Sequence, residues 1–137
     1  MRDTNLIFHD GTNFTATVTP NSTTRSGGSA VLDVGKSGEH GIPVQLVLPS
    51  VIIGSGSPTI DAKMQYSDSA TFASGVEDGP AFPQIDTNTP AGYQRTLLCQ
   101  SKRRYWRLLL TKGGTTLTTS GGLQAHISSG FGQADLS

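Results

Sequence analysis

The chain has 137 residues with zero formal net charge, and only 15% of its residues are charged. This length fits one domain, with a core large enough to fold without disulfides. The balanced charge disfavours a general nucleic-acid-binding protein, which would be basic. No apolar run reaches the roughly 18 residues that a membrane helix needs, so we expect neither nucleic acid nor a membrane as a partner.

The N-terminus and the cysteine content indicate a compartment. The first 14 residues contain no apolar core of signal-peptide length and no cleavage-site pattern. The single cysteine, Cys99, excludes an internal disulfide and a cysteine-based zinc cluster. We therefore expect synthesis in a reducing cytoplasm.

Eight short segments have the character of β-strands. Gly, Pro, Asn and Ser interrupt the sequence about every ten residues, which is typical of a sandwich or barrel. The expected strands are residues 5–9, 14–19, 30–34, 43–48, 59–66, 94–100, 105–111 and 123–128. The sequence thus predicts an all-β, single-domain, jelly-roll-like sandwich of two sheets. The expected divisions are an N-terminal arm or edge strand at residues 1–12, the β-sandwich at residues 13–130 and a C-terminal tail at residues 131–137.

The N-terminal segment is apolar at Leu6 and Phe8 and has no obvious hairpin partner within the chain. An extended segment of this kind can add a strand to the sheet edge of a neighbouring subunit. We therefore expect this segment to make contacts between subunits.

The segment at residues 59–66 shows the clearest strand pattern. Its apolar residues, Ile60, Ala62, Met64 and Tyr66, alternate with polar residues. Successive side chains of a strand point to opposite faces, so this period of two predicts one buried face and one solvated face. Such a strand is typical of an antiparallel sheet packed on one core.

Residues 68–92 are expected to form a long irregular loop that contains Glu77 and Asp78. Loops of this length are uncommon in compact domains and are often functional. The segment is either a solvent-exposed excursion or an interface loop that orders against a neighbouring subunit. Its acidic residues lack the fixed spacing of a calcium loop, so we expect no metal here.

A concentrated basic patch with two aromatic residues occupies residues 102–107. Basic grooves with stacking aromatics bind single-stranded nucleic acid. Strand alternation, however, places Trp106 on the side opposite Arg107, so we expect Trp106 in the core. Arg103 and Arg107 would then be available for bidentate contacts with carboxylates of a protein partner.

The chemistry-bearing residues show no catalytic pattern. His9, His40 and His126 have no His or Cys partner at metal-ligand spacing, and we expect His40 and His126 at the surface. The sequence contains no pattern that would place a general base next to a nucleophilic side chain. We therefore expect neither an enzyme nor a bound metal or cofactor.

The order of four segments resembles that of a known family. They are residues 3–10 (DTNLIFHD), 64–72 (MQYSDSATF), 103–111 (RRYWRLLLT) and 113–127 (GGTTLTTSGGLQAHI). In order, length and style they resemble the cement (decoration) proteins of tailed phages of the Bordetella-phage type. The resemblance covers most of the chain, although each motif by itself is generic.

The resemblance implies a jelly-roll subunit that forms homotrimers on the exterior of an icosahedral virion capsid. It would be made in the host cytoplasm, would bind the major capsid protein and would stabilise contacts between capsid subunits. The residues expected at capsid or inter-subunit contacts are Asp3, Leu6, Phe8, Glu77, Asp78, Arg95, Arg103 and Arg107.

An alternative function is that of a carbohydrate- or receptor-binding sandwich in a phage tail or surface protein. That function requires an exposed aromatic platform. The candidate platform residues are Tyr66, Phe72, Tyr93, Tyr105 and Trp106.

Overall fold

The computed structural model of the chain describes residues 7–24, 28–35, 37–118 and 122–127. These residues form eight strands and a short 3-10 helix at Ser37–His40. The strands are β1 (Ile7–Asp10), β2 (Leu32–Asp33), β3 (Ile42–Leu48), β4 (Thr59–Ser67), β5 (Glu77–Ala81), β6 (Tyr93–Cys99), β7 (Tyr105–Gly113) and β8 (Gln124–Ile127). Nowhere in these ranges is a helix long and apolar enough to cross a bilayer.

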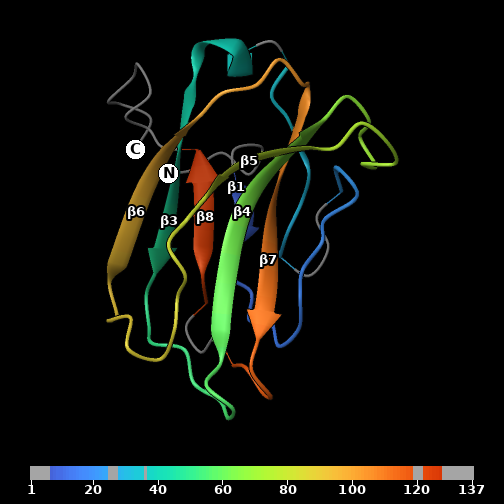
Figure 1. Ribbon diagram of the computed structural model, residues 1–137. Coiled ribbons are helices and arrows are strands. Elements are labelled where there is room, and N and C mark those ends of the chain that lie inside the picture. The colour runs from blue at the N-terminus through green and yellow to red at the C-terminus, as the bar shows by residue number, and fades with distance from the viewer. Residues whose placement is uncertain (1–6, 25–27, 36, 119–121, 128–137) are drawn as a thin grey trace.

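The strands form two four-stranded antiparallel sheets, in the orders β1-β8-β3-β6 and β2-β7-β4-β5 (Figure 1). The pairings are nested along the chain: β1 pairs with β8, β2 with β7, β3 with β6 and β4 with β5. This pattern is that of one long antiparallel hairpin that is rolled up. Its successive strand pairs therefore belong alternately to one sheet and to the other. It is the topology of a jelly roll, so the predicted fold class is confirmed.

The core lies between the two sheets and is built by strand alternation. On β4, Ile60, Ala62 and Met64 are buried, and on β3, Val44 and Leu46 are buried. Full burial of an aliphatic side chain of this size contributes about 1.5–3 kcal/mol, so these rows supply much of the stability of the sandwich. The alternation seen in the sequence therefore reports the inner faces of the two sheets correctly.

Two close approaches to the core require glycine. A Cβ atom at Gly38, in the 3-10 helix, would overlap the indole ring of Trp106. A Cβ atom at Gly79, in β5, would overlap the phenol ring of Tyr66. Tyr66 and Trp106 are themselves packed together, with ring centroids 4.6 Å apart. The backbone at both glycines therefore packs directly on the two largest buried rings and closes this end of the core.

Two expectations about the strands are wrong. Residues 14–19 form no strand, and Val18 makes only an isolated antiparallel bridge to Leu110. Residues 68–92 are not irregular throughout, because Glu77–Ala81 form β5 at the edge of a sheet. An edge strand with charged residues, glycine and proline has no apolar alternation that could reveal it in the sequence.

The described part of the expected N-terminal arm is an edge strand. β1 pairs with β8 along its length, with a register irregularity between Ile7 and His9. The side chain of Phe8 is 0% exposed and belongs to the core. The expectation that Phe8 makes intersubunit contacts is therefore corrected. Asp3 and Leu6, like the tail at residues 131–137, lie outside the described residues.

Candidate interaction surface

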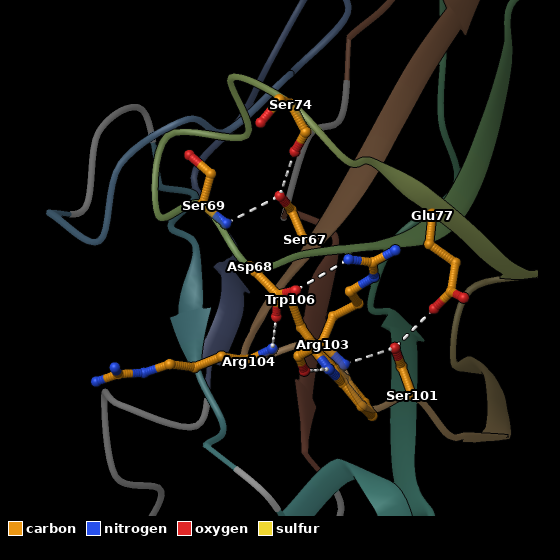
Figure 2. A network of polar contacts seen from close by, with 9 residues as sticks. All are labelled: Ser67, Asp68, Ser69, Ser74, Glu77, Ser101, Arg103, Arg104 and Trp106. Carbon is orange, nitrogen blue, oxygen red and sulfur yellow. Dashed lines mark hydrogen bonds and ion pairs between the residues drawn. The ribbon is translucent and has the colours of Figure 1, made fainter.

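The basic patch lies at the start of β7, where the chain passes from the solvent into the core (Figure 2). Trp106 is 0% exposed, which confirms that it is a core residue. Its indole Nε1 donates a hydrogen bond to the carbonyl oxygen of Arg103 at 3.0 Å. This bond fixes the backbone of the patch relative to the core, so the arginine side chains leave it in defined directions.

Arg103 and Arg104 are paired with carboxylates of their own chain. Nη1 of Arg103 donates to Oδ2 of Asp68 at 2.9 Å, and the Arg104 backbone N–H donates to Oδ1 of the same residue at 3.3 Å. The Arg104 guanidinium makes a two-pronged contact with Asp33, through Nε and Nη2 at 2.9 and 2.8 Å. These contacts tie the start of β7 to the turn after β4 and to β2.

The electrostatics of the Arg104–Asp33 pair follow from this geometry. The hydrogen bond from Arg104 lowers the pKa of Asp33 below its ordinary value. The same hydrogen bond raises the pKa of Arg104. The side chains of Arg104 and Asp33 are 59% and 39% exposed, so solvent screens the pair and it contributes little to stability. Its effect is to orient the guanidinium, which also lies 5.1 Å from the ring centroid of Tyr105.

Arg107 is buried, contrary to the expectation that it contacts a partner. Its Nε and Nη2 atoms donate to Oε1 of Gln65 at 2.9 and 2.7 Å, and its Nη1 donates to the Pro20 carbonyl at 2.9 Å. The guanidinium lies over the ring of Phe72, 4.2 Å from the centroid. Burial lowers the pKa of Arg107. Each of the three guanidinium nitrogens thus donates to an acceptor of its own chain, and the prediction for Arg107 is corrected.

The two acidic residues expected at contacts lie on β5 and are exposed. Oε1 of Glu77 accepts a hydrogen bond from the Ser101 hydroxyl at 2.7 Å, as Figure 2 shows. Oδ1 of Asp78 accepts one from Nε2 of Gln65 at 2.9 Å. The bond from Gln65 lowers the pKa of Asp78, and the positive charge of Lys63 acts in the same direction. Asp78 therefore holds β5 against β4, and Glu77 holds it against the connection between β6 and β7.

Arg95 differs from the arginines at the start of β7. It is exposed on β6, and within the described residues no ion-pair partner lies beside it. On the same strand Leu98 is 69% exposed, the highest value among the large apolar residues described. The contact role predicted for Arg95 is thus compatible with its position, and sequence reasoning missed Leu98 beside it.

Three features bear on catalysis. The ring of His9 is hydrogen-bonded to Ser29, with 2.6 Å between Nδ1 and Oγ, and to the Thr12 carbonyl, 2.8 Å from Nε2. Both side chains of the His9–Ser29 pair are buried, so the pair joins β1 to the segment beside it and offers no open nucleophile. Burial raises the pKa of the Cys99 thiol to about 11, which keeps it protonated at neutral pH. In the described ranges no three His, Cys, Asp or Glu side chains are grouped to hold a metal ion.

The remaining histidines show one further error. His40 is exposed, as expected, whereas His126 on β8 is only 4% exposed. The polar face to which alternation assigns His126 is therefore covered at this point. Searches of protein-family models and of curated proteins find no match to this chain.

Proposed function

We propose that this protein is a capsid cement protein, which binds the exterior of an icosahedral phage capsid as a homotrimer. In this role it stabilises contacts between major capsid subunits and stiffens the shell. The protein is made in the host cytoplasm and resides on the virion surface. The observation that carries the proposal is the eight-strand jelly roll, found in a chain whose segment order resembles that of the phage cement proteins.

The internal pairing of the arginines supports a structural role. Asp68, Asp33 and Gln65 hold the guanidinium groups of Arg103, Arg104 and Arg107, so the end of the sandwich near β7 is locked by its own polar network. A protein that stiffens a shell needs a rigid body, and this network fixes β2 and the end of β4, with the turn after it, to the start of β7. The binding energy would come from several small interfaces of a multivalent trimer.

The aromatic residues weigh against the carbohydrate-binding alternative. Of the five platform candidates, Tyr66, Phe72 and Trp106 are buried. Tyr93 and Tyr105 remain partly exposed, but they lie on β6 and β7, in different sheets. A sugar platform needs neighbouring aromatic faces open to solvent, and these positions do not provide one.

The test combines the native mass of the full chain with co-sedimentation on shells assembled from the major capsid protein of the same phage. We expect a trimer and saturable binding to the shells, together with an increased temperature of shell disruption. A glycan array and Trp106 fluorescence serve as the controls for sugar binding. A monomer at all concentrations that does not bind shells would overturn the proposal.

A further inference from the structure

Three of the four sheet edges are protected by the chain itself. Beside β1, the Asp10 N–H donates to the Gly28 carbonyl at 2.9 Å, and the Ala30 N–H donates to the Phe8 carbonyl at 3.2 Å. β2 is only two residues long. β5 contains glycine and proline and is irregular in its register with β4. Short strands, prolines, irregularities and covering segments are the devices by which proteins block edge-to-edge pairing.

The fourth edge strand, β6, is neither short nor irregular, and within the described residues no segment covers it; its one charged residue is Arg95. Its seven residues pair with β3 in unbroken register, from Ile42 opposite Cys99 to Leu48 opposite Tyr93. It contains neither glycine nor proline. Among the strands of the described chain, β3 alone pairs with it, and β6 forms the margin of its sheet (Figure 1). A regular strand of this length presents an outer row of backbone N–H and C=O groups that can pair with another strand.

We propose that β6 is a docking edge to which an extended segment of a partner chain adds as a fifth strand of the sheet. The side chains of β6 specify that segment. Arg95 lies opposite Leu46, whose side chain is in the core, so Arg95 is on the inner face at the open margin of the sandwich. Leu98 lies opposite Pro43, on the outer face. The added strand would present a carboxylate to Arg95 and an apolar side chain to Leu98.

The spacing of these two residues limits the sequence of the partner. Arg95 and Leu98 are three positions apart, and an odd spacing places them on opposite faces of the strand. Side chains directly opposite each other across a ladder share a face. The docking segment therefore has an acidic residue and an apolar residue three positions apart, in an extended conformation without proline between them.

The partner is a different chain rather than a second copy. The other three edges of a second copy are protected in the same way, which leaves β6 as the described edge that could pair with β6. Such a pair would have two-fold symmetry and would bring two Arg95 side chains into one interface, where like charges repel. This inference rests on the proposed function, because it identifies the partner as an extended, acidic segment of the major capsid protein.

The test measures how two substitutions in β6 affect binding to capsid shells, one that reverses a charge and one that replaces an apolar residue with a charged one. Each is compared with a substitution of the same kind at an exposed position outside β6. Arg95→Glu is matched by Lys102→Glu, because Lys102 is also an exposed cation without an ion-pair partner among the described residues. Leu98→Lys is matched by Ile53→Lys, at a position that is 52% exposed. All four variants are first checked for native thermal unfolding, and their binding to the capsid shells is then measured by co-sedimentation.

We expect Arg95→Glu and Leu98→Lys each to weaken shell binding at least about tenfold, which corresponds to ~1.4 kcal/mol, while both controls bind as the unmodified protein does. Hydrogen exchange should show that the β6 amides are protected when the protein is bound to shells. Raising the concentration of the free protein should not protect them. Equal binding of all four variants would overturn the docking edge and leave the proposed function intact. Protection that grows with protein concentration alone would identify a second copy as the occupant and overturn the choice of partner. If the unmodified protein does not bind shells, both proposals fail.

Discussion

Replacing Gln65 with leucine is expected to destabilise the fold strongly, because Gln65 is the main acceptor for a buried arginine. Gln65 and Arg107 lie directly opposite each other on β4 and β7. Oε1 of Gln65 accepts from Nε and Nη2 of Arg107, at 2.9 and 2.7 Å. Leucine offers no acceptor, so two donors of a charged group would remain buried without partners.

The magnitude follows from these two bonds. A hydrogen bond to a charged group contributes about 1.5–3 kcal/mol, and the leucine side chain recovers part of that through apolar burial. We expect a net loss of about 2–4 kcal/mol in the free energy of unfolding. For a domain of this size that loss lowers the melting temperature by roughly 6–15 °C. The loss in the free energy of unfolding is measured by urea unfolding at neutral pH, followed by Trp106 fluorescence.

The matched control is Gln45→Leu, on β3. Gln45 is partly exposed, and its Nε2 donates a hydrogen bond at the surface to Oε1 of Gln94, at 3.2 Å. This control is expected to change stability by less than about 0.5 kcal/mol. Adding Arg107→Leu to Gln65→Leu should restore part of the loss, because a buried charge is then replaced by apolar packing. Equal effects of the two glutamine substitutions would refute the view that Gln65 solvates a buried arginine.

Three further predictions concern the same end of the sandwich and its core. Gly38→Ala forces a Cβ atom against the indole of Trp106 and should cost about 1–3 kcal/mol with a changed fluorescence maximum; an unchanged spectrum and stability would contradict the close packing. Because the hydrogen bond from Arg104 depresses the folded-state pKa of Asp33, this bond stabilises the fold above the ordinary Asp value of 3.8 and is lost as the pH falls through the depressed folded-state pKa. Because solvent screens this exposed pair, Asp33→Asn should flatten the acid limb of the stability profile only slightly, and a limb that becomes steeper would count against the reasoning. Cys99, with its thiol pKa raised to about 11 by burial, should react with a thiol reagent only after unfolding, as absorbance assays can show.

The sequence predicted those parts of the fold that alternation encodes. The rows at Ile60–Met64 and at Trp106–Leu110 follow the period of two because one face of each strand lies on the core. The same rule could not find β5, because Glu77–Ala81 form an edge strand with no buried row. Nor could it place Arg107, because alternation gives the face of a residue but not what covers that face. Here Phe72 and the Pro20 carbonyl cover it, and both come from segments without a strand pattern.

The described arginines of this molecule fall into two groups: those paired within their own chain, which tie segments of the fold together, and Arg95, which is available to a partner. The sequence predicts Arg103 and Arg107 at a partner site, yet both, like Arg104 between them, are held by a group from a distant segment. A guanidinium already paired within its own chain offers a partner little, since a new contact must first displace the existing one. Arg95 has no such competing carboxylate among the described residues, and it lies on the one regular edge strand that no other described segment covers. Backbone pairing at that edge and charge at Arg95 would act on the same added strand, so recognition is expected at β6 rather than at the start of β7.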